Sequence, residues 1–218
     1  MPEPGRQGLE PAAAPGRPKQ GQPPRGAESH TQWANVGANT LWLVRHARPL
    51  IEPGICYGQL DVAADAEATR VGAEALADVL PHGITMVCSP LQRCEQLAQV
   101  LIGLRVDLTC KTDVRLKEMD FGQWEGQRWD AIDPAALAAW TDHFAHHSPG
   151  TRGESVAQFM ARVGQAFDEL SPAEHVWITH AGVIRAAQLL AQGVRHVERA
   201  DQWPVDAPAF GQWCTLNL

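Results

Sequence analysis

Short segments rich in apolar residues are spread along the chain, and turn formers or polar residues bound each of them. Runs of this length are typical of strands buried in a parallel sheet. A later segment alternates apolar and polar residues instead, which is typical of an edge strand. We therefore predict strands at residues 41–44, 84–88, 106–109, 175–179 and, at the edge, 212–216.

The segments between these strands repeat apolar residues at helical spacing. In residues 66–80, for example, Val71, Ala75 and Val79 recur on one face, which predicts an amphipathic helix. Further helices are expected at residues 91–101, 134–146, 154–170 and 181–191. Ser89 is placed to cap the second of these helices, with a proline in its first turn. Because strands alternate with helices, we predict an α/β fold, a three-layer αβα sandwich with a mostly parallel sheet.

Two segments fall outside this alternation. Residues 1–28 contain seven prolines and five glycines and almost no large apolar side chains. Such a segment buries too little surface to offset the entropy of ordering it. We therefore expect a disordered Pro/Gly-rich tail over residues 1–38 and a folded domain over residues 39–218. Within the domain, residues 111–153 are rich in Trp and Gly, and we expect a short insertion folded over the active site.

Composition excludes several classes of protein. The net charge of −7 argues against a broad basic surface that binds nucleic acid. No apolar run approaches the roughly 18 residues of a membrane helix, and the first residues lack the layout of a secretory signal. The five cysteines are scattered without a CxxC pair, which argues against a disulfide framework or a thiolate zinc site. We expect a cytoplasmic protein without nucleic-acid or membrane partners.

Two of the predicted strands run directly into a histidine, at His46 and His180. Arg45 precedes the first histidine, and Arg93 falls in the first turn of the helix after the second strand. The carboxyl ends of parallel strands meet at one edge of a sheet, so we expect these four side chains to converge. Arginines match phosphoryl oxygens in geometry and keep their charge. The sequence therefore predicts a site for a small phosphorylated metabolite, with no metal or other cofactor.

The insertion supplies an acid for the leaving oxygen. Glu118 has apolar neighbours in the sequence, such as Met119 and Phe121. Partial desolvation by these residues favours a protonated carboxyl group, which can donate a proton. Two nearby carboxylates have plainer interpretations: Asp120 as a solvated loop charge, and Glu125 as a structural salt bridge or cap.

Five motifs along the chain carry this chemistry. They are Leu43-Val44-Arg45-His46, Ser89-Pro90-Leu91-x-Arg93-Cys94, Leu116-x-Glu118-x-x-Phe121-Gly122-x-Trp124-Glu125-Gly126, Gly153-Glu154-Ser155 and Thr179-His180-Ala181-Gly182. In these motifs and their order, the chain resembles the histidine phosphatase superfamily, also called phosphoglycerate-mutase-like. The resemblance implies that His46 is the nucleophile and forms a phosphohistidine. It also implies that Arg45, Arg93 and His180 hold the phosphoryl group, and that Glu118 protonates the leaving alcohol and then activates water.

The chain departs from the family pattern after the nucleophile. The family usually has Arg-His-Gly there, whereas this chain has Ala47-Arg48-Pro49, which should reshape the loop that contacts the substrate. Besides the arginines and His180, the substrate-binding candidates are Arg48, Tyr57, Gly58, Gln59, Glu154 and Ala181.

The insertion also indicates which branch of the family the chain resembles. The insertion is shorter than in the phosphoglycerate mutases of this clan. The phosphohistidine phosphatases of the clan lack its Phe-Gly-x-Trp-Glu-Gly element. The chain looks most like the α-ribazole phosphatase branch, which removes the 5′-phosphate of α-ribazole phosphate in cobalamin biosynthesis. The alternatives are a broad-specificity small-molecule or sugar phosphatase, mutase-type phosphotransfer, and a non-catalytic protein that binds phosphorylated ligands.

Two further groups of side chains in the insertion have two interpretations each. Trp124, Trp129 and Trp140 fit either a pocket for an aromatic or nucleoside-like leaving group or ordinary core packing. His143, His146 and His147 have the spacing of metal ligands on a helix, but without a carboxylate or cysteine partner we favour a polar helix face.

Overall fold

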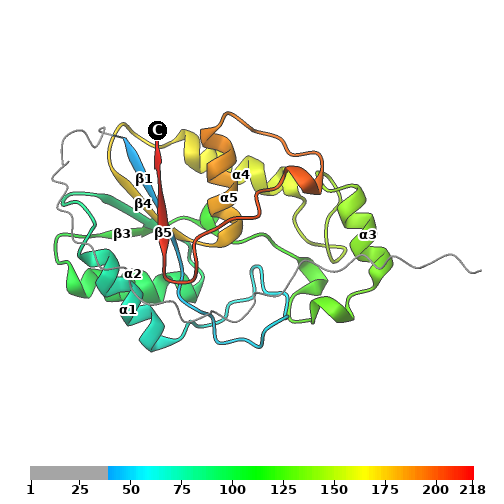
Figure 1. Cartoon of the computed structure of the whole chain (residues 1–218), viewed down its shortest axis with the longest axis horizontal. Coiled ribbons are helices and arrows are strands. Elements are labelled where there is room, and N and C mark those ends of the chain that lie inside the picture. Colours follow the sequence, from blue (N-terminus) through cyan, green and yellow to red (C-terminus); the bar gives the residue numbers. More distant parts are fainter. Residues whose placement is uncertain (1–38) are drawn as a thin grey trace, which may run out of the picture. The chain divides into compact units, whose positions relative to one another are not determined.

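A five-stranded sheet is the centre of the computed structural model, which describes residues 39–218 (Figure 1). The predicted tail over residues 1–38 lies outside the described residues. The strands are β1 (Thr40–Arg45), β2 (Thr85–Cys88), β3 (Cys110–Thr112), β4 (His175–Thr179) and β5 (Trp213–Asn217). Their order is β3-β2-β4-β1-β5, and β5 is antiparallel to β1 while the other pairs are parallel. The predicted α/β class with a mostly parallel sheet is confirmed.

Helices cover both faces of this sheet (Figure 1). The α-helices are α1 (Ala66–Ala77), α2 (Gln92–Leu104), α3 (Pro134–Asp142), α4 (Val156–Asp168) and α5 (Ala181–Ala191). Side chains alternate along β1: Leu41 and Leu43 pack with α4 and α5, whereas Val44 packs with α1 and α2. The described domain therefore has the predicted three layers. Short 3₁₀ helices lie at Val114–Leu116, Gly122–Trp124, Trp129–Ala131 and Ala200–Gln202.

The third strand was predicted wrongly at residues 106–109, because β3 begins only at Cys110. Val106 is almost fully exposed and lies in a turn after α2. The guanidinium group of Arg105 donates hydrogen bonds to the carbonyls of Ala77 and Leu80. These bonds tie the end of α2 to the end of α1 and keep the turn out of the sheet.

Two details of the predicted helices were also wrong. The helix expected to reach residue 146 ends at Asp142, because His143 leaves the helical backbone conformation (φ −119°, ψ 44°). Ser89 is not the N-cap residue of α2: that residue is Leu91, whose own side chain makes no capping hydrogen bond. The N–H of Gln92, the first residue of α2, donates to Oδ1 of Asp61 (2.8 Å). The hydroxyl group of Ser89 instead reaches the ring of His180.

The strands β1, β2 and β4 end side by side at one edge of the sheet. The register pairs Arg45 with Thr179, and the N–H of His46 donates to the Thr179 carbonyl (3.0 Å). The N–H of Ser89, directly after β2, donates to a carbonyl of β4 (2.9 Å). The residues that follow the three strands therefore start from adjacent positions, as parallel strands require.

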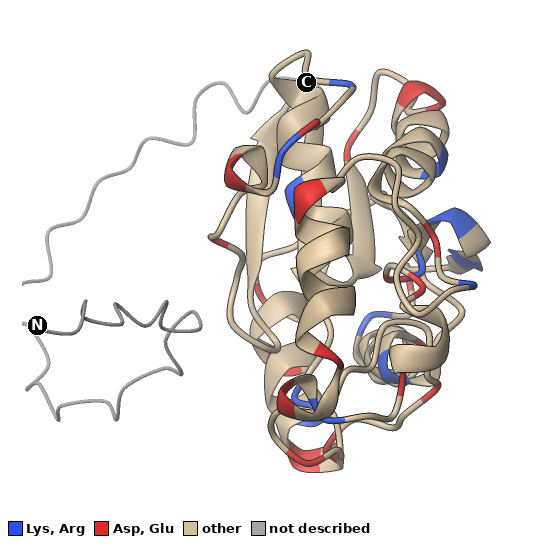
Figure 2. Cartoon of the chain, turned by 90° about the vertical axis from the view of Figure 1, so that its right-hand side faces the viewer, with Lys and Arg blue, Asp and Glu red and all other residues tan. Residues whose placement is uncertain are grey.

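Residues of both charge signs are interspersed along the ribbon in Figure 2. Several of them are paired, as in Arg70–Glu74 and Arg195–Asp168. Within residues 39–218, no helix has the length and apolar character needed to span a membrane.

Candidate active site

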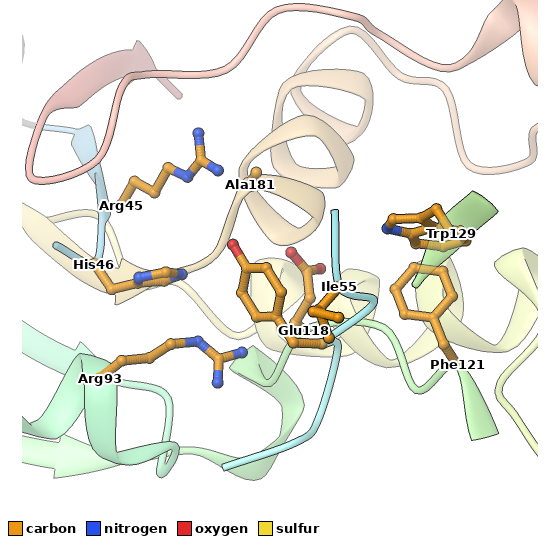
Figure 3. Close-up of a pocket in the computed structure, with 9 residues that line it drawn as sticks. Arg45, His46, Ile55, Arg93, Glu118, Phe121, Trp129 and Ala181 are labelled. Atoms are coloured by element: carbon orange, nitrogen blue, oxygen red, sulfur yellow. The ribbon is translucent and has the colours of Figure 1, made fainter. Parts of the chain in front are cut away.

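A cavity of about 150 Å³, which we call the phosphoryl cavity, lies at the edge of the sheet where β1 ends. In Figure 3, Arg45 and Arg93 lie on either side of His46, and Glu118 lies between this group and two aromatic rings. The cavity thus brings together four of the five predicted catalytic residues. Its lining residues are Arg45, His46, Ile55, Tyr57, Arg93, Glu118, Phe121, Trp129 and Ala181.

His46 is buried, and a hydrogen bond fixes the tautomer of its ring. Its Nδ1 lies 2.7 Å from the carbonyl oxygen of Ala47. A carbonyl oxygen can only accept, so Nδ1 carries the proton and Nε2 keeps its lone pair. Burial, with the positive charge of Arg93, lowers the pKa of His46 to about 3. The ring is therefore neutral near pH 7 and is able to act as a nucleophile through Nε2.

Arg45 is held beside the cavity by the segment that precedes β5. Its Nη1 donates to the carbonyl of Pro208 (3.0 Å), and its guanidinium carbon lies 3.9 Å from the centre of the Phe210 ring. Its Nε is buried and has no hydrogen-bond partner among the described residues. A buried donor without a partner is destabilising. Arg45 nevertheless lines the cavity, so its guanidinium charge is available to a phosphoryl group.

Arg93 is fully buried, and neutral acceptors hold each of its nitrogens. Nη2 donates to the carbonyl of Gly58 (2.7 Å), Nη1 to that of Leu60 (2.9 Å) and Nε to Nδ1 of His180 (3.3 Å). Its charge therefore remains available to an anion. Gly58 is needed for this arrangement, because a Cβ there would lie 1.8 Å from the carbonyl oxygen of Met119.

His180 lies behind Arg93 and is not one of the residues that line the cavity. Its Nδ1 accepts from Arg93, so the neutral ring carries its proton on Nε2, which donates to Oγ of Ser89 (2.9 Å). Burial, together with the nearby His46 and Arg93, lowers the pKa of His180 well below its usual value. In this geometry His180 positions Arg93, and a direct bond to a phosphoryl group would require one of these two hydrogen bonds to break.

Glu118 is fixed at the N-terminal end of α5. Its Oε2 accepts from the N–H of Gly182 (3.0 Å), and its Oε1 accepts from the N–H of Met119 (3.0 Å). A Cβ at position 182 would lie 2.1 Å from Oε1, so the glycine leaves room for the carboxylate. Glu118 is half-buried and borders the cavity opposite the arginines and His46, where an acid–base group would reach the leaving oxygen.

Glu154 was predicted to bind substrate, but it lies outside the cavity and pairs with Arg162 of α4 (2.6 Å). The guanidinium group of Arg162 also donates to the carbonyls of Arg115, Lys117 and Glu118 (2.6, 2.8 and 3.0 Å). This network holds the backbone that carries the Glu118 side chain. Glu154 therefore serves the site by positioning and does not line it.

Arg48 also lies away from the phosphoryl cavity. Its side chain is exposed and pairs with Asp65 (3.2 Å), the residue whose side chain caps α1. The N–H of Asp65 donates in turn to the Arg48 carbonyl (2.8 Å). Arg48 therefore closes the loop between β1 and α1.

Two carboxylates of the insertion shape the loops around the cavity. Glu125 is a cap, as expected: its Oε1 accepts from the N–H groups of Gln59 (2.7 Å) and Phe121 (3.0 Å). Gln59 is thereby tied to the insertion through its backbone, and its side chain does not line the cavity. Asp120 is not a plain solvated charge, because it is half-buried and its Oδ1 accepts from the N–H of Gly122 (2.7 Å).

Several residues that shape this site were not identified from the sequence. Ser89 and Gly182 stand inside motifs that were recognised, next to predicted site residues, so a signal for them was present. Pro208 and Phe210 had no local signal, because the return of the chain before β5 brings them to Arg45. Ile55, which lines the cavity, was also not identified.

The histidine cluster of the insertion lies at and beyond the end of α3, so it does not form a helix face. His143 is the C-cap residue of α3, and His146 and His147 lie in the turn after it. Among residues 39–218, no group of three or more His, Cys, Asp or Glu side chains is arranged to hold a metal ion.

Several known proteins are similar to this chain. Residues 41–209 match the family model of the histidine phosphatase superfamily (branch 1). Glucosyl-3-phosphoglycerate phosphatase of Mycobacterium tuberculosis is 31% identical over 167 residues, 68% of this chain and 73% of that protein. The putative phosphoserine phosphatase 2 of Hydrogenobacter thermophilus is 27% identical over 165 residues, 71% of this chain and 79% of that protein.

Solved structures show the same similarity. A mycobacterial glucosyl-3-phosphoglycerate phosphatase in complex with VO3 has a TM-score of 0.68 at 25% identity, covering 83% of this chain and 91% of that one. TTHB049 of Thermus thermophilus has a TM-score of 0.60 at 29% identity, covering 81% of this chain and 92% of that one.

Proposed function

Because the chain belongs to the histidine phosphatase superfamily and its named relatives are phosphatases, we propose that it is a phosphoric monoester hydrolase that works through a phosphohistidine at His46. The observation that carries this proposal is the neutral, oriented ring of His46 between Arg45 and Arg93. A nitrogen lone pair held between two guanidinium groups suits attack on the phosphorus of an anionic ester. The partner is a small phosphorylated metabolite.

In the first step, the lone pair of His46 Nε2 attacks phosphorus and the bond from phosphorus to the alcohol oxygen breaks. Glu118 gives its proton to that oxygen, and the alcohol leaves. Arg45 and Arg93 stabilise the charge on the remaining phosphoryl oxygens during the transfer. His180 keeps Arg93 in place through the bond at Nδ1.

In the second step, Glu118 is a carboxylate and takes a proton from a water molecule. The water oxygen attacks phosphorus, the bond to His46 Nε2 breaks, and inorganic phosphate leaves. The hydrogen bonds from Gly182 and Met119 hold the carboxylate in one place through both steps.

The named relatives favour one class of substrate over the one that the sequence predicted. Their names give glucosyl-3-phosphoglycerate and, putatively, phosphoserine as substrates of those proteins, and both compounds carry a carboxylate near the phosphate. They lend no specific support to α-ribazole 5′-phosphate. We therefore place a carboxylated phosphate ester first and α-ribazole 5′-phosphate second.

The test is phosphate release from glucosyl-3-phosphoglycerate, phosphoserine, 3-phosphoglycerate, α-ribazole 5′-phosphate and p-nitrophenyl phosphate. We expect turnover that falls by at least ~10³-fold in His46→Ala, which lacks the nucleophile. His82→Ala, at an exposed histidine, is the matched control and should keep full activity. Full activity in His46→Ala would overturn the mechanism, and conversion of 3-phosphoglycerate to its isomer would favour a mutase. No turnover by the wild type would favour a non-catalytic binding protein.

A further inference from the structure

A second cavity, of about 460 Å³, lies next to the phosphoryl cavity, and we call it the aromatic cavity. The two cavities share Glu118, Phe121 and Trp129 as lining residues, so the proposed acid–base group stands at their boundary. Most of the large side chains that line it are aromatic. These are Phe121, Trp129, Trp140, Phe144, Phe159 and Trp203.

The aromatic rings support one another around this space. Trp140 packs against Phe121 (ring centres 6.0 Å apart) and Phe144 (5.5 Å), and Phe144 packs against Trp203 (6.2 Å). Ordinary core packing would leave no void of this size among such side chains. The volume falls within the roughly 300–1,000 Å³ of preformed small-molecule sites.

The aromatic cavity bears on the two interpretations of the insertion tryptophans. Trp129 and Trp140 line the aromatic cavity. Trp124 does not line this cavity: it is buried with Cys56 and Ile132 in an apolar cluster against which Trp129 and Trp140 pack. Trp129 and Trp140 therefore line a cavity and also pack against Trp124, so both interpretations remain open for them, whereas core packing describes Trp124.

Besides Glu118, the charged side chain that lines the aromatic cavity is that of Arg185. Its Nε is enclosed by protein atoms and has no hydrogen-bond partner among the described residues. Arg185 donates through Nη2 to the carbonyl of Val205 (2.7 Å), a neutral acceptor, so its charge remains available. A guanidinium group binds a carboxylate more strongly than a neutral acceptor. The walls of the cavity are therefore mostly aromatic, and the guanidinium group of Arg185 is available there to an anionic acceptor.

We propose that the aromatic cavity binds the alcohol part of the substrate, and that this alcohol carries a flat apolar ring and a carboxylate. The proposal rests on the phosphatase function proposed above and names its substrate class. The ring lies among the aromatic side chains, the carboxylate accepts from the guanidinium group of Arg185, and the ester oxygen lies at Glu118 between the two cavities. A polyhydroxylated ring suits this site less well, because mostly aromatic walls offer its hydroxyl groups few hydrogen-bond partners.

The test compares esters of primary alcohols, so that the leaving oxygen stays alike: propyl phosphate, benzyl phosphate and para-carboxybenzyl phosphate. For the wild type we expect KM for para-carboxybenzyl phosphate to be about tenfold or more below KM for propyl phosphate, with benzyl phosphate between them. Thr141→Trp places a large ring at an exposed position on the cavity wall. It should raise KM for both ring esters about fivefold and leave propyl phosphate within about twofold.

Arg185→Gln distinguishes the contribution of the ligand's carboxylate to binding from that of its ring. It should raise KM for para-carboxybenzyl phosphate about tenfold and KM for benzyl phosphate less than about threefold. Arg199→Gln is the matched control: Arg199 is exposed, pairs with Asp201 and does not line either cavity. It should leave all three values unchanged.

Some outcomes overturn this inference while the phosphatase function stands. The inference is overturned if the three esters have equal KM values that Thr141→Trp does not change. It is also overturned if the protein prefers glucosyl-3-phosphoglycerate to para-carboxybenzyl phosphate. If no ester is hydrolysed, the proposed function fails, and calorimetric titration with 2-(para-carboxyphenyl)ethylphosphonate tests the cavity separately. Tighter binding than propylphosphonate, lost in Thr141→Trp, supports the aromatic cavity as a ligand site, and equal binding overturns it.

Discussion

Glu118 and Gly182 are joined by a hydrogen bond of 3.0 Å, in which an N–H of the first turn of α5 donates to the carboxylate. The bond connects two parts of the site that are distant in the sequence. Glu118 belongs to the insertion, whereas α5 follows β4 directly through His180. The unpaired N–H groups at the start of a helix favour a carboxylate there. The position of the proposed acid–base group thus depends on having no side chain at residue 182.

We predict that Gly182→Ala lowers kcat for propyl phosphate about 100-fold, because the new Cβ would lie 2.1 Å from Oε1 and displace the carboxylate. The loss should be smaller for p-nitrophenyl phosphate, whose leaving group needs no proton. Gly103→Ala in α2 is the control, since a Cβ there meets nothing within 4 Å. A wild-type rate in Gly182→Ala on propyl phosphate would contradict the role of Glu118.

Substitutions of Arg45 and Arg48 should differ sharply in their effect on activity. Arg45→Ala removes a charge from the phosphoryl cavity, and we expect kcat/KM for p-nitrophenyl phosphate to fall by ~10²- to 10³-fold. Arg48→Ala removes an exposed side chain paired with Asp65, so the same constant should stay within about threefold. A larger loss in Arg48→Ala than in Arg45→Ala would restore the substrate contact that the sequence predicted.

Glu154→Gln should separate positioning from substrate contact. Losing the pair with Arg162 loosens the backbone at Glu118, so we expect kcat to fall about tenfold with KM within about twofold. The free energy of unfolding should fall by about 2 kcal/mol, because both partners are largely buried. Asp168→Asn, in an exposed ion pair, is the control. An increase in KM at unchanged stability would show that Glu154 contacts the substrate after all.

Protein stability should depend on pH through His46. The pKa of His46 is about 3 in the folded chain and near 6.5 in the unfolded chain. Between these values the unfolded chain binds a proton that the folded chain does not, so stability falls as pH falls from 6.5 towards 3 and is unaffected above 6.5.

Between pH 7.5 and pH 4.5, the wild type should therefore lose about 3 kcal/mol more of its free energy of unfolding than His46→Asn loses. Denaturant unfolding at the two pH values measures the difference. His82→Asn, at an exposed position, should keep the wild-type dependence. The same pH dependence in His46→Asn and wild type would show that His46 is not held neutral in the folded chain.

The sequence was most informative where structure depends on neighbouring residues. Strand β4 was predicted at its observed bounds, because a strand buried on both faces is a continuous apolar run. Strand β3 was missed because the turn before it is held by contacts of Arg105 with α1, about 25 residues earlier in the chain.

The site residues also divide into those that a local pattern predicts and those that depend on distant segments. Arg45, His46 and Arg93 were found because each lies at or shortly after the end of a strand, and the topology brings strand ends together. The position of His180 behind Arg93, the pairing of Glu154 with Arg162 and the contact of Phe210 with Arg45 all depend on side chains from distant segments. No local pattern specifies such contacts, so they emerged only from the structure.

The most direct test is to trap the phosphoryl group on His46. Wild-type protein is mixed with excess p-nitrophenyl phosphate and quenched in alkali, which preserves phosphohistidine, and its peptides are then mapped by mass spectrometry. We expect an acid-labile phosphoryl group on the peptide that contains His46, and none in His46→Ala. It should accumulate in Glu118→Gln, which lacks the base that activates water. Turnover without phosphorylated His46, or a phosphoryl group on another residue, would contradict the proposed mechanism.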